Sequence, residues 1–318
     1  MILVCGEALI DLFLVSTDSG PVLEVAMGGS PFNLALGLAR LETPAGFFGG
    51  VSNDYFGVML IEALANEGVD TSLVKRSVRP TPLVLVSPDS QGNPSYTFYA
   101  HEAAAEGIEL ADVSQPLPPS VDAIALGSYL LAVEPAGTAL LALAEREAHR
   151  RVIAIDCNLR PAMVGPIHAW RQHIERFARC ASIIKLSDED FAGGWSDGAS
   201  PDDQAASWLK HGVRLVLMTH GPRGATAWHS SGRVTAPALP VEVVDSVGAG
   251  DSFQAALLAR LAQNGLLNPR ALSTLDGSSI ADAMRYANLA AGMTCRRRGA
   301  NLPRRAEIEQ CLSRGEGT

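Results

Sequence analysis

The chain has 318 residues and a formal net charge of −9, with 25 lysine and arginine residues against 34 aspartate and glutamate residues. This acidic balance disfavours nucleic acid and anionic membranes as partners, and the lack of a signal-peptide core or a membrane-length apolar run indicates a cytoplasmic protein. Five scattered cysteines without a Cys-x-x-Cys pair favour buried reduced thiols over disulfides or a metal cluster.

Short apolar runs alternate with helix-length periodic segments, which is typical of βαβ units. The alternation predicts an α/β fold with a mostly parallel central sheet covered on both faces. The predicted strands are Ile2–Cys5, Ala45–Phe48, Ala123–Leu126, Val152–Asp156, Ile183–Leu186 and Leu215–Thr219. The predicted helices are Ser30–Leu41, Asp54–Glu67, Pro135–His149, Ile167–Ala178, Asp202–Lys210, Gly250–Gln263, Ile280–Thr294 and Arg304–Leu312. No linker divides the chain, so we expect one domain over residues 1–318.

Two stretches, Leu12–Ala26 and Pro82–Ala100, interrupt this alternation and contain strand and turn patterns without a helix. Within the second, Asp89–Pro94 has the composition of a turn and Tyr96–Tyr99 that of a strand. Together the two stretches predict a small separate sheet. An ordinary hairpin excursion is the competing interpretation.

Polar residues follow the first predicted strand, near the sheet edge where α/β proteins bind ligands. Asp11 and Asn33 offer a carboxylate and an amide, which suit the paired hydroxyls of a sugar, and Gly28-Gly29 allows the backbone to approach a ligand closely. The alternative interpretation is structural: Asp11 is an acidic residue of the surface or a turn, and Asn33 is a helix-capping residue.

Three later strands end in polar motifs at the same edge. Asp156-Cys-Asn-Leu-Arg160 places an arginine there, whose forked guanidinium suits a phosphate, although a surface ion pair is the alternative. Lys185-Leu-Ser-Asp-Glu-Asp190 has the pattern of a helix N-cap with an acidic first turn. Thr219-His-Gly-Pro-Arg-Gly224 carries two glycines that let a loop wrap around phosphates, and a plain turn would look similar.

The stretch Asp245-Ser-Val-Gly-Ala-Gly-Asp-Ser-Phe253 is the most informative in the chain. It follows a strand-like run, Val241–Val244, and opens an apolar helix. The N–H groups of Gly248, Ala249 and Gly250 can stabilise an oxyanion while Asp251 takes a proton from an attacking hydroxyl, which is the chemistry of phosphoryl transfer. A glycine-rich turn with Asp251 as a favourable first-turn acid is the alternative.

Other phosphate motifs are absent from the sequence. A dinucleotide fingerprint requires glycine at position 253, which is Phe253, and no lysine follows a glycine as a P-loop requires. We therefore expect backbone amides and arginine to bind any phosphate.

Asp245–Asp251 resembles the C-terminal signature of the ribokinase-like sugar kinases, the family of B-type phosphofructokinases, fructokinases and adenosine kinases. Gly28–Asn33 followed by Leu34–Leu41 resembles its N-terminal signature. The resemblance extends from Ile2 to about Pro303. It implies a ribokinase-like three-layer sandwich with a small β-sheet lid over the sugar, formed by about residues 12–26 and 82–100. Lids of this kind often make the dimer contact, so the resemblance also implies a homodimer.

The resemblance implies a role for each motif. It implies that Asp251 is the catalytic base and that Gly248, Ala249 and Gly250 form the anion site. The residues that it places around the sugar are Asp11, Gly28, Gly29, Asn33, Phe98, Asn158 and Arg160. Those that it places around ATP are Lys185, Ser187, Thr219, Gly221, Gly224 and Asn288. Asp190 stands where the family has a glutamate that organises Mg²⁺, which leaves Glu189 as an alternative. For an activating K⁺, the matching positions are Asp245, the Val247 carbonyl and carbonyls within Thr294–Gly299.

These expectations favour an ATP-dependent sugar kinase, most like a fructokinase. The alternatives are a 2-keto-3-deoxygluconate kinase, a ribokinase or a nucleoside kinase. An acid-sugar kinase would need an extra cation near the lid, where this chain has Ala100, although Arg160 remains. A non-catalytic sensor is disfavoured because it has no need of a base such as Asp251.

Overall fold

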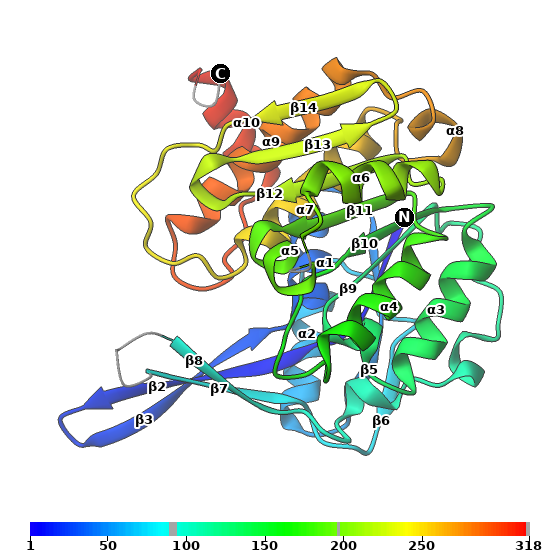
Figure 1. Cartoon of the computed structure of the whole chain (residues 1–318). Coiled ribbons are helices and arrows are strands. Elements are labelled where there is room, and N and C mark those ends of the chain that lie inside the picture. The colour runs from blue at the N-terminus through cyan, green and yellow to red at the C-terminus, as the bar shows by residue number, and fades with distance from the viewer. Residues whose placement is uncertain (89–93, 196–197, 316–318) are drawn as a thin grey trace.

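The computed structural model describes residues 1–88, 94–195 and 198–315 (Figure 1). Its centre is an eight-stranded sheet in the order β14-β13-β12-β11-β10-β9-β1-β4. Neighbours from β4 to β12 are parallel, and the last two strands are antiparallel. This confirms the mostly parallel α/β sheet. The strands are β1 Ile2–Cys5, β4 Ala45–Phe48, β9 Ala123–Gly127, β10 Val152–Asp156, β11 Ile183–Ser187, β12 Leu215–Thr219, β13 Ala225–His229 and β14 Gly232–Ala236.

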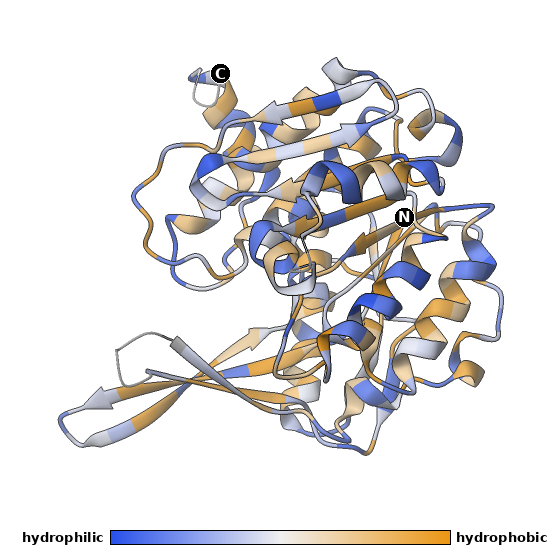
Figure 2. Ribbon diagram, in the orientation of Figure 1, coloured by the Kyte–Doolittle hydropathy of each residue, from blue (hydrophilic) through white to orange (hydrophobic). Residues whose placement is uncertain are grey.

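Helices cover both faces of this sheet, and the strand sequences explain why. Side chains alternate across a strand, and in β1 Ile2 and Val4 enter one hydrophobic cluster while Leu3 and Cys5 enter another. The apolar strands are visible between the helices in Figure 2. On the first face lie α1 Ser30–Arg40, α2 Tyr55–Asn66, α7 Ala249–Gln263, α8 Pro269–Leu272, α9 Gly277–Cys295 and α10 Arg305–Ser313. On the second lie α3 Ala136–Glu147, α4 Ile167–Ala178, α5 Asp188–Gly194 and α6 Pro201–Lys210.

A separate four-stranded sheet in the order β3-β2-β7-β8 projects from this body (Figure 1). Its strands are β2 Leu9–Thr17, β3 Gly20–Gly28, β7 Leu83–Pro88 and β8 Pro94–Tyr99. The small sheet confirms the two strand-and-turn stretches expected from the sequence. Residues 89–93, most of the expected turn Asp89–Pro94, lie outside the described residues. Two short strands, β5 Gly50–Ser52 and β6 Lys75–Ser77, pair with each other.

Cross-strand pairing assigns side chains to the two faces of the small sheet. Asp11 pairs with Ala26 and with Val84, and Val84 pairs with Phe98. Directly paired residues share a face, so Asp11 and Phe98 lie on the same side of the sheet. The opposite side of the sheet carries five apolar residues that are each more than a third exposed: Leu14, Leu23, Val25, Met27 and Tyr99.

Two sequence expectations differ from the structure. Val241–Val244 was expected to be a strand, but it forms no strand, and Val243 and Val244 are exposed. Its backbone turns instead to the end of α9, where the Val244 N–H donates to the carbonyl of Cys295 at 2.8 Å. Helix α9 begins at Gly277, before the expected Ile280, because the Asp276 side chain caps it by accepting from the Ser279 N–H.

All five cysteines are free thiols; Cys5, Cys157 and Cys311 are buried as expected, whereas Cys180 and Cys295 are partly exposed. None of the helices in the described ranges is long and apolar enough to span a membrane.

Candidate active site

Helix α7 begins with a tight glycine turn. Gly248 has φ 77°, and a Cβ there would come within 2.7 Å of the Ala300 Cβ, so that both conformation and space require glycine. The Ala249 N–H donates to the Ser246 carbonyl at 3.2 Å. Of the three amides expected to bind an anion, this one is therefore engaged. The N–H groups of Gly248 and Gly250 have no acceptor among the described residues and lie at the positive end of the helix.

Asp251 lies in the first turn of α7 and is buried. Both of its carboxylate oxygens are held by the first turn of α1. Ser30 Oγ donates to Oδ1 at 2.6 Å, and Asn33 Nδ2 donates to Oδ2 at 2.8 Å. The two helices pack closely, since a Cβ at Gly37 would lie 2.8 Å from the Ala255 Cβ. The structure thus joins the two sequence motifs, and it gives Asn33 a partner that the sequence did not reveal.

Asp11 is close enough to Asp251 and Arg160 for their charges to affect it. A Cβ at Gly28 would come within 2.2 Å of Asp11 Oδ2, so the carboxylate lies directly against the Gly28 backbone. Burial raises the pKa of Asp11 to about 6, an effect that Arg160 opposes and the charge of Asp251 reinforces. Arg160 is exposed, donates to the Leu159 carbonyl at 3.1 Å, and makes no ion pair with a carboxylate in the described part of the chain.

Glu7 is a site residue that the sequence analysis missed. It follows β1 and is 1% exposed, and its Oε2 has no hydrogen-bond partner among the described residues. Burial raises the pKa of Glu7 to about 7, while a hydrogen bond from Ser128 and the charge of Arg160 lower it and Asp251 raises it. A Cβ at Gly29 would lie 2.8 Å from the Glu7 carbonyl oxygen. The backbone of Glu7 therefore lies against Gly29, and hydropathy patterns give no signal for a functional residue there.

Lys185 lies next to the start of α7. Its Nζ donates to Asp156 Oδ2 at 2.7 Å, and both side chains are buried. A Cβ at Gly250 would lie 3.3 Å from this ammonium. Burial alone would lower the pKa of Lys185, but Asp156, Asp190 and Asp251 together outweigh it and the pKa is raised. A cation thus lies beside the free amides of the turn, in addition to the amides and arginine expected from the sequence to bind phosphate.

Asp190 has a clear local role. It forms a capping box with Ser187: the Asp190 N–H donates to Ser187 Oγ at 3.0 Å, and the Ser187 N–H donates to Asp190 Oδ2 at 2.8 Å. Its other oxygen, Oδ1, accepts from the Leu159 N–H at 2.7 Å. Asp190 therefore fixes the loop that carries Asn158, which has φ 34°, and Arg160. Glu189, the alternative, is exposed.

The expected nucleotide loop follows β12. Thr219 pairs with Ser187 in the sheet, so two of the expected nucleotide residues are neighbours. Gly221 and Gly224 both have positive φ, and a Cβ at Gly224 would lie 2.1 Å from the Ala236 carbonyl oxygen. Arg223 donates to Asp188 Oδ2 at 2.7 Å and so ties this loop to α5.

Asn288 on α9 is buried, and its Nδ2 donates to the carbonyls of Ala236 and Pro237 at 3.0 and 2.8 Å. Its amide hydrogens therefore fix the backbone after β14. Any contact of Asn288 with a nucleotide would have to use its oxygen.

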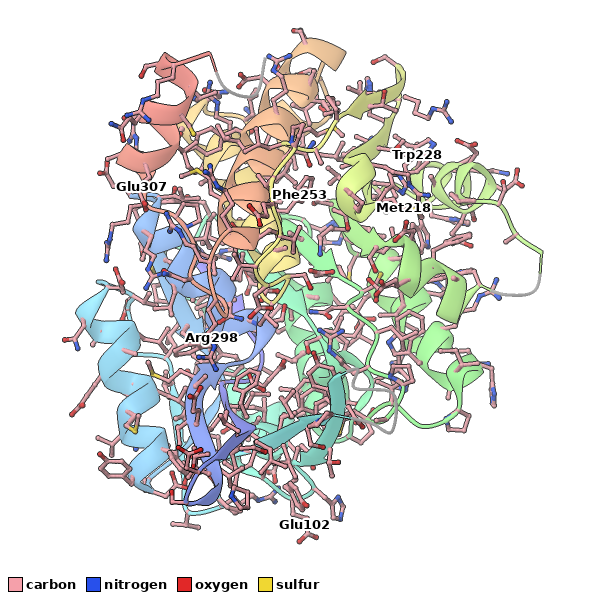
Figure 3. All side chains as sticks on the ribbon, turned by 90° about the vertical axis from the view of Figure 1, so that its left-hand side faces the viewer. Glu102, Met218, Trp228, Phe253, Arg298 and Glu307 are labelled. Atoms are coloured by element: carbon pink, nitrogen blue, oxygen red, sulfur yellow. The ribbon has the colours of Figure 1, made fainter. Side chains whose placement is uncertain are left out.

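Asp245 joins the two segments expected to hold a monovalent cation. Its Oδ1 accepts from the Val247 N–H at 3.0 Å, and its Oδ2 accepts from the Gly299 N–H at 2.8 Å. Arg298, the residue before Gly299 in this loop, reaches the small sheet, where it donates to Glu24 of β3 at 2.5 Å (Figure 3). One loop therefore touches both the start of α7 and the small sheet.

The sequence model of the family described as "pfkB family carbohydrate kinase" matches residues 1–307 of the chain. The chain belongs to this family. A fructokinase of Rhizobium leguminosarum bv. trifolii is 38% identical to the kinase over 281 residues, covering 88% of this chain and 85% of the relative. The crystal structure of a Xylella fastidiosa fructokinase with bound ATP shares its fold, with a TM-score of 0.90, 24% identity, and coverage of 99% of this chain and 98% of that one. A Vibrio cholerae fructokinase in a fructose-, ADP- and calcium-bound form has a TM-score of 0.81 and 25% identity, covering 97% of each chain.

The kinase has carboxylates suited to Mg²⁺ rather than a dedicated cage. No group of three or more His, Cys, Asp or Glu residues in the described ranges could hold a metal. Asp156 Oδ1 is buried without a partner among the same residues, and Asp190 lies behind the loop that follows it. Mg²⁺ usually keeps several waters and binds one or two carboxylates together with substrate phosphates. The residues of this kinase fit that mode of binding.

Proposed function

We propose that this carbohydrate kinase is a fructokinase, which transfers the γ-phosphoryl group of ATP to a hydroxyl of D-fructose. The observation that carries the proposal is the Asp11 carboxylate, which lies against Gly28 and interacts with the charges of Asp251 and Arg160. Carboxylates accept hydrogen bonds from sugar hydroxyls, and those of Asp11 and Asp251 repel a substrate carboxylate. The named fructokinase relative at 38% identity supports the same substrate.

In the proposed reaction Asp251 is the general base. It takes the proton of the attacking hydroxyl, whose oxygen forms a bond to the γ-phosphorus while the bond to the β-phosphate oxygen breaks and ADP leaves with the electron pair. The free N–H groups of Gly248 and Gly250 and the ammonium of Lys185 stabilise the negative charge on the transferring group. Ala249 keeps the turn closed through its bond to Ser246.

We propose that the small sheet is the lid over the sugar. Asp11 binds hydroxyls from the base of β2, and the Gly28-Gly29 turn allows the sugar to approach the backbone. Asn158 and Arg160 close the opposite side. Phe98 shares a sheet face with Asp11 and packs with Leu9 and Val84, so its ring is placed to cover the apolar face of the sugar.

For ATP we propose the edge formed by Lys185, Ser187, Thr219 and the Gly221–Gly224 turn, with Asn288 behind it. Mg²⁺, when bound, neutralises the phosphate charge, and Asp190 and Asp156 are the carboxylates available to hold it with its waters. For K⁺ we propose the junction of Asp245, the Val247 carbonyl and the Thr294–Gly299 loop, because Asp245 already joins these two segments.

A 2-keto-3-deoxygluconate kinase is the second candidate function, and Arg160 is the residue that favours it, since its guanidinium has no carboxylate partner among the described residues. Ala100, where an additional cation would be expected, is buried. The carboxylates of Asp11 and Asp251 give the sugar site negative charge, which favours the neutral ketohexose over an acid sugar.

The experiment is an ADP-release assay with fructose, ribose, 2-keto-3-deoxygluconate and adenosine. We expect the highest kcat/KM with fructose, and a higher value with 2-keto-3-deoxygluconate would replace the proposal with the second candidate. Asp251→Asn keeps the shape of the side chain but cannot accept the proton, so kcat should fall by roughly 10²–10⁴ with both KM values nearly unchanged. Near-normal turnover of that variant would refute the assigned base.

We further propose that the kinase is a homodimer in which the outer faces of two lids meet. Leu14, Leu23, Val25, Met27 and Tyr99 lie on the face opposite Asp11 and are between 39% and 60% exposed. An exposed apolar patch of this kind is typical of an interface. Light scattering should give the mass of a dimer for the wild type and of a monomer for Val25→Lys. A monomeric wild type at micromolar concentration would contradict the proposal.

A further inference from the structure

The carboxylate of Asp251 is held on both sides by one turn of α1. Ser30 and Asn33 are three residues apart on the helix, so their side chains lie on the same face. One binds Oδ1 at 2.6 Å and the other binds Oδ2 at 2.8 Å. Such bonds to a charged acceptor are short and strong, and they fix the direction in which the carboxylate points. The orientation of the proposed base is therefore set by a helix more than 200 residues away in the sequence.

The two donors differ in what they can do after proton transfer. The Asn33 amide nitrogen can only donate a hydrogen bond, so Oδ2 must remain an acceptor and is not the oxygen that carries the proton. The Ser30 hydroxyl can donate or accept, because it carries both a hydrogen and lone pairs. When Asp251 becomes a carboxylic acid, its new O–H needs an acceptor in this buried place. The proton can therefore reside on Oδ1, which faces Ser30. Rotation of the Ser30 hydroxyl turns it from a donor to Oδ1 into an acceptor from the new O–H.

We propose that Ser30 is a positioning residue for catalysis, whose hydroxyl serves Asp251 in both of its protonation states. Before transfer it donates to the carboxylate and directs it toward the sugar hydroxyl. After transfer, with the sugar proton on Asp251, it accepts from the acid at Oδ1, and the proton leaves for solvent once the products depart. Asn33 holds Oδ2 and keeps the carboxylate plane fixed. This inference rests on the proposed role of Asp251 as the base.

The test compares Ser30→Ala with Ser30→Thr, which restores the hydroxyl. We expect Ser30→Ala to lower kcat by about tenfold to a hundredfold, the usual effect of losing a hydrogen bond to a charged group, while the KM values for ATP and sugar stay within about twofold. Ser30→Thr should recover kcat to within about threefold of the wild type. Ser278→Ala, which changes a serine in the first turn of α9 whose hydroxyl donates to Asp276, is the matched control and should leave kcat unchanged.

Three results would overturn the role of Ser30. They are a Ser30→Ala kcat within twofold of the wild type, an equal loss in Ser30→Thr, and a rise in the sugar KM with kcat intact, which would make Ser30 a substrate ligand instead. Each of these requires an active wild type. A wild type that releases no ADP with any sugar would overturn the proposed function as well, so the two failures are distinguishable.

Discussion

The buried pair of Lys185 and Asp156 leads to a quantitative prediction about stability. The two side chains are 6% and 2% exposed, and their charged atoms are 2.7 Å apart. Lys185→Met replaces the ammonium with an apolar group of similar length. Asp156 then stays in the sheet with no counter-ion, and its Oδ1 already lacks a hydrogen-bond partner among the described residues. The variant therefore leaves an uncompensated charge inside the protein.

Breaking a buried pair by removing one partner costs about 3–5 kcal/mol of unfolding free energy. The cost should depend on pH, because burial raises the pKa of Asp156 and Lys185 opposes that rise. Without Lys185 the carboxyl should bind a proton more readily in the folded state. A raised carboxyl pKa means that stability is retained at low pH and lost as the pH rises. The deficit of Lys185→Met should therefore be larger at pH 8 than at pH 5.

Urea unfolding at both pH values, followed by tryptophan fluorescence, measures this deficit. Trp170 and Trp195 are buried reporters, with ring centroids 5.5 Å apart. The double variant Asp156→Asn with Lys185→Met should recover most of the loss, because it removes both charges. Lys210→Met, at the exposed end of α6, is the control and should cost less than about 0.5 kcal/mol. A deficit below about 1 kcal/mol at pH 8, or one equal at both pH values, would refute the reasoning.

Three further predictions concern other parts of the site. Burial raises the pKa of Glu7 from 4.5 to about 7, so its contribution to stability is present below about pH 4.5 and lost as the pH rises through 7. Glu7→Gln should therefore unfold like the wild type at pH 4.5 but be up to about 3 kcal/mol more stable at pH 8, and a pH-independent difference in urea unfolding would contradict this. Phe98→Ala should raise the sugar KM about tenfold and increase the ratio of ATP consumed to sugar phosphorylated, because an open lid admits water. Phe13→Ala, on the same face of the sheet, is the control. A ratio that stays unchanged in Phe98→Ala would show that Phe98 does not exclude water from the site. Replacing Na⁺ by K⁺ at matched ionic strength should raise kcat if Asp245 and the Thr294–Gly299 loop hold a cation, and equal rates would exclude it.

Much of the fold follows from local patterns in the sequence. Apolar runs such as Val152–Asp156 are short, continuous and bounded by polar residues, which is the signal of a strand buried on both faces, and the structure confirms it. Helices with clear caps, such as α5 after Ser187, also begin where the sequence predicts. The run Val241–Val244 shows the limit of this reasoning. Its β-branched residues have strand propensity, but the edge of the sheet is already formed by β13 and β14.

The sequence by itself determined the glycine turn before α7, because the need for glycine at Gly248 and the position of Asp251 at a helix start are local properties. Tertiary structure decided what surrounds that turn. The contact of Ser30 with Asp251 depends on the packing of α1 against α7, and the approach of Lys185 to Gly250 depends on the position of β11 in the sheet. Burial of Glu7 and the rise in its pKa likewise require neighbours from other strands. Local propensity acts over a few residues, whereas distances of a few ångströms between remote side chains exist only after the layers have packed.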